Sequence, residues 1–163
     1  MNPQDKESGI YNEKTLITII LMTLIPSAYS TEKLDITAGP EIDNCWRNNA
    51  DRGKATECLH ALSDKSNKDM DELIAKTVRQ IKENNSGPVF KGEDPQQTIG
   101  DVFSKLFLDS QNSWKQYRKN LCLGVGSQIG KDTDDYWPYI YQCQINLNKR
   151  HIEEIKMIRA DEK

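Results

Sequence analysis

The chain has 163 residues, enough for one domain, and its 36% hydrophobic and 29% charged residues allow a modest core. Its net charge of −3 at pH 7 lacks the basic excess on which nucleic-acid binding depends. A mildly acidic protein would instead suit a basic protein partner, because net charge influences association rather than fold.

The first thirty residues have the organisation of a secretory signal peptide. A polar segment, residues 1–15, is followed by ten uncharged residues, Leu16–Ile25, and then by the small residues Ala28 and Ser30. Small residues at these positions suit signal peptidase, and a bilayer span needs about 20 apolar residues. We therefore predict cleavage after Ser30, a periplasmic or secreted mature protein, and no membrane segment in it. An uncleaved interfacial or core helix is the alternative, since the leading segment carries two lysines against three acidic residues.

Four cysteines follow in the predicted mature part: Cys45, Cys58, Cys122 and Cys143. An even number of cysteines in a small exported domain is typical of a disulfide framework. Three pairings are possible, and we favour Cys45–Cys58 with Cys122–Cys143 because each closes a short loop within one region. A zinc site is the alternative, but the chain has no Cys-x-x-Cys pair and its histidines lack ligand spacing. The sequence thus predicts two disulfides, with no metal and no cofactor.

One long helix is predicted after a polar lead-in. Residues 31–50 contain Gly39-Pro40 and are expected to be extended. Helical signals begin at Asp51, a residue type favoured at the N-cap, and continue to about Asn85, where Gly87-Pro88 interrupts them. The predicted inner stripe, at steps of three and four, is Leu59, Leu62, Ser66, Met70, Leu73, Thr77 and Ile81.

Two further helices are predicted in the second half of the chain. Asp94 and Pro95 suit a helix start, because Asp caps helices and Pro fits the first turn, and this helix is expected to end at Cys122. A loop with three glycines precedes a third helix from Asp134 or Asp135. The inner stripes are Ile99, Phe103, Leu106, Ser110, Trp114, Tyr117 and Leu121, then Ile140, Cys143, Leu147, His151, Ile155 and Ile158. The predicted fold is all-α: residues 51–163 form a disulfide-stapled antiparallel bundle of about three long helices.

Known catalytic and ligand-binding motifs do not fit this chain. The loop LGVGSQIGKDT has Val125 where a P-loop needs glycine, and Asp132 follows its lysine instead of Ser or Thr. An EF-hand read from Asp132 would have Trp137 and Cys143 where Gly and Glu belong. We therefore predict no catalytic residues and no enzymatic activity.

The stretch SWKQYRKNLC places Trp114, Tyr117, Arg118 and Cys122 on one helical face. We interpret this face as the inner seam of the second helix, with Trp114 and Tyr117 packed inside. Arg118, and Arg150 on the third helix, are expected to form internal salt bridges or to stack on an aromatic ring. The alternative is a cationic anchor for the carboxylates of a partner.

These residues carry a resemblance to a known family. The pattern consists of Trp114, Tyr117, Arg118 and Cys122, followed by Cys143, Arg150 and Ile155. It resembles the LprI family, the domain of a bacterial exported lysozyme inhibitor and of many relatives. The resemblance implies a periplasmic protein that inhibits lysozyme or a related peptidoglycan hydrolase by protein–protein contact. The alternatives are an immunity protein against a cell-envelope toxin, or a structural or interaction protein of the envelope.

The partner-binding residues are expected in loops and not on the helical seam. Lysozyme-type sites use two carboxylates in a cleft, which a loop carrying a hydroxyl or a cation could enter. Ser127 and Lys131, between the second and third helices, and Lys91, between the first and second, are the candidates. The sequence makes no prediction of the oligomeric state.

Overall fold

The computed structural model describes residues 35–90, 94 and 96–158. The chain divides into two units, Met1–Glu32 and Lys33–Lys163, and all described residues belong to the second. The predicted signal peptide lies outside the described residues. None of the helices within the described ranges is long and apolar enough to cross a membrane.

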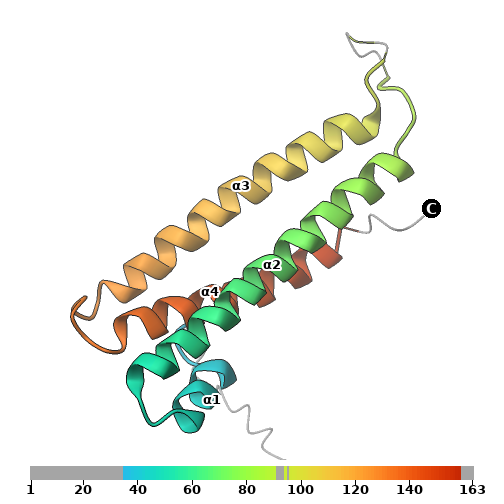
Figure 1. The fold of residues 1–163 in the computed structure, drawn as a ribbon. Helices are drawn as coiled ribbons and strands as arrows, with labels where there is room; N and C mark the ends of the chain where they lie inside the picture. Colours follow the sequence, from blue (N-terminus) through green and yellow to red (C-terminus); the bar gives the residue numbers. More distant parts are fainter. Residues whose placement is uncertain (1–34, 91–93, 95, 159–163) are drawn as a thin grey trace, which may run out of the picture. The chain divides into compact units, whose positions relative to one another are not determined.

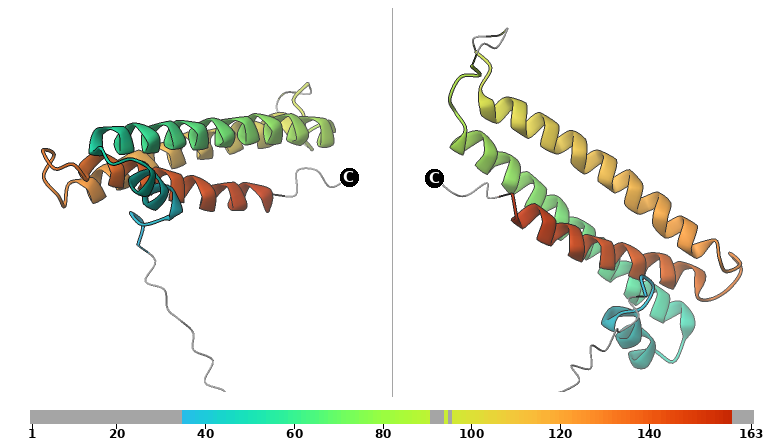
Figure 2. Two further views of the ribbon diagram at one scale, coloured as in Figure 1. Left: turned by 60° about the horizontal axis from the view of Figure 1, so that its bottom comes forward. Right: turned by 180° about the vertical axis from the view of Figure 1, so that it is seen from behind.

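The described part of the chain is all-α, as predicted, and contains no strand apart from an isolated bridge between Pro88 and Thr98. Its helices are α1 (Pro40–Asn48), α2 (Arg52–Asn84), α3 (Ile99–Gly126) and α4 (Tyr136–Lys156). The three long helices α2, α3 and α4 pack against one another, and α3 runs antiparallel to both others (Figures 1 and 2). The short α1 packs on α2 and α4 near the start of α2.

Both predicted disulfides are confirmed. Cys45 is bonded to Cys58, 13 residues away, and Cys122 to Cys143, 21 residues away. The first bond joins α1 to α2 and the second joins α3 to α4, so no cysteine remains free. Such bonds persist in oxidising compartments.

The predicted start of α2 is confirmed, whereas that of α3 is wrong. Asp51 caps α2 by accepting a hydrogen bond from the Lys54 backbone at 2.9 Å. Helix α3 begins at Ile99 and not at Asp94, because Thr98 and Asp101 cap each other's backbone N–H groups in a capping box. The helix also continues one turn beyond Cys122, to Gly126.

The lead-in predicted to be extended over residues 31–50 contains helix α1, so that prediction is wrong for Pro40–Asn48. The helix is short and buries only two residues, Ile42 and Cys45, which leaves a weak periodic signal. Tertiary contacts fix it instead: the Ile42 backbone N–H donates to Gln142 Oε1 at 2.8 Å. At Gly39 a Cβ would lie 2.5 Å from Gln142 Nε2, so a larger residue there would displace the Gln142 amide.

Glu41 links α1 to α4 and should make stability depend on pH. Its carboxylate accepts hydrogen bonds from Lys149 Nζ at 2.5 Å and Gln142 Nε2 at 3.0 Å. Burial alone would raise the pKa of Glu41, but these hydrogen bonds and the lysine charge hold the pKa below its usual value of 4.5. A carboxyl whose pKa is lowered by folding stabilises above its unfolded pKa and loses that stabilisation as pH falls through the folded pKa.

We therefore expect Glu41→Gln to lower the free energy of unfolding by about 1 kcal/mol at pH 7 and by much less at pH 3. Urea unfolding of both proteins at the two pH values measures this. An equal loss at both values would show that the charge of Glu41 does not contribute. Glu153→Gln is the matched control, since its ion pair with Lys156 is largely exposed and should contribute little at either pH.

The buried face of α3 differs from its predicted stripe. Several stripe residues are exposed: Ile99, Leu106, Ser110 and Tyr117. The residues buried against α2 and α4 are instead Gly100, Ser104, Phe107, Gln111, Cys122 and Gly126. Small residues let the helices approach closely, and buried polar residues find hydrogen-bond partners between helices. Phe103, Trp114 and Leu121 of the predicted stripe are half-buried and pack against the core, so apolar spacing alone finds only part of the inner face of α3.

Gly100 lies where the backbones of α3 and α2 approach closely. A Cβ at this position would lie 2.9 Å from Lys82 Cα and 3.0 Å from the Asn85 carbonyl oxygen, both backbone atoms. We expect Gly100→Ala to destabilise the fold by about 1–3 kcal/mol, because the two backbones must separate. Gly124→Ala on the same helix is the control, since its Cβ would meet nothing within 4 Å, and should stabilise by about 0.5–1 kcal/mol. Thermal unfolding of both variants tests the contrast; two similar losses would contradict it.

Candidate functional site

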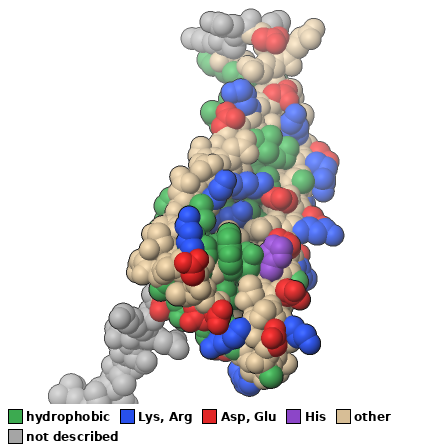
Figure 3. All heavy atoms as spheres, turned by 60° about the vertical axis from the view of Figure 1, so that its left-hand side comes forward, with side chains coloured by type: hydrophobic (Ala, Val, Ile, Leu, Met, Phe, Trp, Pro, Cys, Tyr) green, Lys and Arg blue, Asp and Glu red, His purple; other side chains and the backbone are tan. Residues whose placement is uncertain are grey.

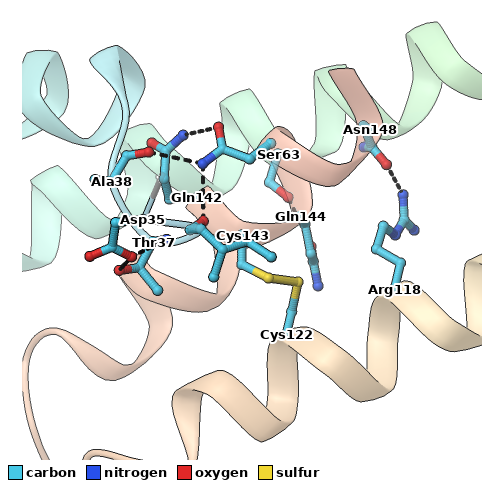
Figure 4. The surroundings of a disulfide bond; sticks show 12 residues. Asp35, Thr37, Ala38, Ser63, Arg118, Cys122, Gln142, Cys143, Gln144 and Asn148 are labelled. Carbon is cyan, nitrogen blue, oxygen red and sulfur yellow. Dashed lines mark hydrogen bonds between the residues drawn. A yellow bond between two sulfur atoms is a disulfide. The ribbon is translucent and has the colours of Figure 1, made fainter. Parts of the chain in front are cut away.

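The loop between α3 and α4 is closed at its base by a disulfide. Residues 127–135 connect the helices, and the Cys122–Cys143 bond lies between the ends of α3 and α4 (Figure 4). Turns order the loop: the backbone N–H of Thr133 donates to the Gly130 carbonyl at 3.0 Å. The Thr133 hydroxyl donates to the same carbonyl at 2.7 Å.

The structure brings two of the three predicted partner-binding residues onto this loop. Ser127 and Lys131 are both exposed there, whereas Lys91 lies outside the described residues. The Ser127 hydroxyl donates to the Gly124 carbonyl at 2.7 Å, so its proton is already used in a hydrogen bond at the end of α3. Lys131 is the only lysine of the loop and has three aspartates for neighbours, Asp132, Asp134 and Asp135.

An aromatic run that the sequence analysis did not single out follows directly on this loop. The letters YWPYIY begin α4, and Trp137 keeps 49% of its surface exposed. Its ring centroid lies 6.0 Å from that of Tyr141, which in turn lies 4.8 Å from the His60 ring on α2. The sequence signal that could have identified this region is the high density of Tyr and Trp next to a loop, since these residues are enriched at interfaces.

A second aromatic group belongs to the same end of the bundle. Trp46 of α1 and Tyr139 of α4 have ring centroids 6.4 Å apart. The Arg52 guanidinium lies 4.9 Å from the Trp46 ring and also pairs with Asp135 at 3.7 Å. Arg52 therefore connects α1 and the start of α2 to the last residue of the loop. Trp46, Tyr139 and Tyr141 are half-buried and pack against the core on one side. We call the residues of both groups the aromatic surface: Trp46, Arg52, His60, Trp137, Tyr139 and Tyr141.

Charged side chains lie near the rings of the aromatic surface. Burial, together with the negative charge of Asp64, raises the pKa of the Tyr141 hydroxyl, so this hydroxyl stays protonated and can donate a hydrogen bond. His60 lies 3.6 Å from Asp64. Figure 3 shows hydrophobic side chains open on one face of the molecule, beside a histidine and among side chains of both charges.

Arg118, by contrast, is directed into the bundle (Figure 4). Its Nη1 donates to Asn67 Oδ1 at 2.7 Å and to Asn148 Oδ1. Asn148 is fully buried and donates in turn to Ser66 and Asn67. Burial lowers the pKa of Arg118, while the charge of Asp71 acts in the opposite direction. The predicted internal salt bridge is wrong, because amide oxygens receive the guanidinium protons in place of a carboxylate.

Aromatic stacking completes this inner cluster. The predicted stacking of Arg118 on Trp114 is confirmed, with the guanidinium 5.3 Å from the ring centroid. Trp114 also stacks on His151, with centroids 3.9 Å apart and an interplanar angle of 7°. His151 contacts Gln111 Oε1 through Nε2 and Glu154 Oε2 through Nδ1, each at 2.7 Å.

Two other predictions for the seam are wrong. Tyr117 is 55% exposed and is not packed inside, and Arg150 is exposed and not internal. Both side chains lie on the outer sides of their helices. The sequence spacing assigned them to the inner faces, but spacing of three and four residues defines a helical face only approximately. The seam residues Trp114, Arg118 and Cys122 thus hold the helices together.

Within the described residues, no three His, Cys, Asp or Glu side chains come together as a metal site would require. Rings, one guanidinium and hydroxyls are instead the accessible groups of the aromatic surface, and these are groups suited to packing and hydrogen bonding with another molecule.

Comparison of the chain with family models finds no match. Comparison with curated proteins and with solved structures finds no match either.

Proposed function

We propose that the protein is an exported binding protein that inhibits lysozyme or a related peptidoglycan hydrolase by direct contact. The aromatic surface is the observation that carries the binding role, since Trp, Tyr and Arg are the residues most enriched in binding hot spots. The resemblance to the LprI family, the signal-peptide pattern and the disulfides support the exported location and the choice of partner.

The loop 127–135 and the aromatic surface would form one contact. Trp137 follows the loop by two residues, and Arg52 pairs with Asp135, which connects the two parts. Lys131 is the better candidate for the two carboxylates of a lysozyme-type site, because the Ser127 hydroxyl already donates to Gly124. The aspartates beside Lys131 suit basic groups around the cleft of such an enzyme.

Titration of lysozyme with the purified protein tests this proposal. We expect loss of lytic activity at micromolar concentration of the protein, and at least about tenfold weaker inhibition by Trp137→Ala, since anchor residues at interfaces contribute more than 1 kcal/mol each. Lys131→Ala should weaken inhibition and Ser127→Ala should change it little.

Met157→Ala is the matched control. Met157 is 72% exposed and lies at the C-terminal end of α4, whereas the aromatic surface lies at its start. The Met157→Ala variant should therefore inhibit lysozyme as strongly as the unchanged protein does. Full lytic activity in a micromolar excess of the protein would reject lysozyme as the partner. Inhibition that Trp137→Ala and Lys131→Ala leave intact would reject the proposed surface.

A further inference from the structure

The two disulfides differ in how deeply they are buried. Cys122 and Cys143 have no exposed surface, and their bond lies between the long helices α3 and α4 (Figure 4). Cys45 is 1% exposed, whereas its partner Cys58 is half-buried and keeps part of its surface open to solvent. Disulfide exchange begins with a thiolate that reaches one of the two sulfurs. Cys58 is therefore the cysteine that a reagent in solution approaches most easily.

The helices that the two bonds join also differ in how readily they separate from the bundle. Helix α1 has nine residues, of which only Ile42 and Cys45 are buried, and a helix of this length is not stable alone. The other bond joins helices of 28 and 21 residues and packs in a core cluster with Tyr136, Ile140 and Leu147. Local opening of a short outer element costs less free energy than opening of the core. Access to the Cys45–Cys58 bond thus requires the smaller opening.

The bond that is easier to reach also encloses part of the aromatic surface. Trp46 follows Cys45 directly, and Arg52 begins α2 before Cys58. The Trp46 ring lies 6.4 Å from that of Tyr139 on α4 and 4.9 Å from the Arg52 guanidinium. Because the bond closes a loop of 13 residues, it restricts where the Trp46 ring can lie. The state of this bond therefore influences the shape of the aromatic surface.

We infer that the Cys45–Cys58 bond is a redox switch of the aromatic surface, which a small dithiol reduces before it reduces Cys122–Cys143. One thiolate of the dithiol attacks the Cys58 sulfur, forms a mixed disulfide and displaces Cys45 as a thiolate. The second thiol of the reagent attacks the mixed disulfide, closes the reagent's own disulfide and releases Cys58. Two electrons pass from the dithiol to the protein disulfide, and the two protons of the dithiol pass to the sulfurs of Cys45 and Cys58.

Reduction leaves α1 with noncovalent contacts only. The Ile42 backbone still donates to Gln142, and Glu41 still accepts from Gln142 and Lys149. These bonds connect α1 to α4, whereas the disulfide is the covalent connection of α1 to α2. Without it the start of α2 is free to move away from α1, and the Arg52 guanidinium with it from the Trp46 ring. The reduced protein is thus expected to have a loosened aromatic surface on an intact three-helix bundle.

Timed alkylation of the full chain in dithiothreitol tests the order of reduction. Samples are taken at intervals, capped with iodoacetamide and analysed by peptide mass spectrometry. We expect Cys45 and Cys58 to be labelled at least about tenfold faster than Cys122 and Cys143, so that a species with two labels accumulates first. Equal rates for all four cysteines, or faster labelling of Cys122 and Cys143, would overturn the inference.

Two variants test whether opening of α1 sets the rate. Ile42→Ala removes a residue of α1 that is 2% exposed, and Glu41→Gln weakens the link to Lys149. Each should accelerate labelling of Cys45 and Cys58 by about threefold or more and leave the labelling of Cys122 and Cys143 unchanged. Met157→Ala, at the other end of α4, is the control and should change neither rate. Circular dichroism verifies that the variants fold. Acceleration of both bonds alike would show that global unfolding governs reduction and would contradict the switch.

The effect on inhibition rests on the proposed function and is measured separately. Cys45→Ala/Cys58→Ala reproduces the open bond without a label, and it should inhibit lysozyme at least about threefold more weakly than the unchanged protein. If the unchanged protein does not inhibit lysozyme, the proposed function fails while the order of labelling still decides which bond is reduced first. If the unchanged protein inhibits and the variant inhibits equally well, the bond does not control the surface and the switch is rejected.

Discussion

Replacing Arg118 by alanine is expected to lower the free energy of unfolding by about 3 kcal/mol, the range observed when a buried charged network loses one member. Arg118 donates to both Asn67 and Asn148. Without it, two amide oxygens inside the bundle lose their charged donor, and Asn148, with no exposed surface, cannot turn to water. The Trp114 ring also loses the guanidinium 5.3 Å from its centroid.

Two further variants separate the network from the charge. Arg118→Lys keeps the charge but lacks the planar fork that reaches two acceptors and stacks on a ring, so it should recover only a small part of the loss. Arg150→Ala removes the other arginine predicted to be internal from a site that is exposed and should change stability by about 0.5 kcal/mol or less. Guanidinium unfolding followed by tryptophan fluorescence measures all three. Equal small losses for Arg118→Ala and Arg150→Ala would show that the buried network does not stabilise the fold.

The sequence predicts the long helices well because their signals are local. Asp51 is a good N-cap residue and lies where α2 begins, and Pro138 falls in the first turn of α4. The disulfide pairing also follows from the chain, since each bond joins helices that are neighbours in sequence. Local signals and short loops are therefore sufficient for the topology of this bundle.

The inner face of α3 could not be predicted in the same way. Gln111 is buried because His151 lies 2.7 Å from it, and Gly100 because the α2 backbone passes over it. Both reasons are tertiary contacts between residues far apart in the chain. Conversely, Leu106 and Tyr117 have the composition of a core and yet face outward, which apolar spacing cannot reveal.

The candidate site was predicted only in part, for a related reason. Ser127 and Lys131 were found because loops between helices are natural binding sites. The aromatic surface requires residues from α1, α2 and α4 to meet, and α1 itself is held by Gln142 and a disulfide more than by its own periodicity. No single stretch of sequence contains that information, although the run YWPYIY contains three of the five rings.

Removal of the Cys122–Cys143 bond is the second change with a large expected effect. The double variant Cys122→Ala/Cys143→Ala should lose about 3 kcal/mol of unfolding free energy, since the bond closes a loop of 21 residues in the unfolded chain. Both side chains are fully buried, so alanine avoids placing a new hydroxyl in the core. Loosening should concentrate where the bond acts, at the last turn of α3, the loop 127–135 and the first turns of α4.

Cys45→Ala/Cys58→Ala is the matched control, because its bond closes a loop of 13 residues and the chain-entropy loss is again about 3 kcal/mol. Chemical unfolding should therefore give similar losses, whereas amide hydrogen exchange should separate the two variants. Exchange should accelerate around residues 123–140 in the first variant and around α1 in the second. Unchanged exchange of residues 123–140 without the Cys122–Cys143 bond would mean that the Gly126 contact with Ile140 and the packing around it already hold the loop in place.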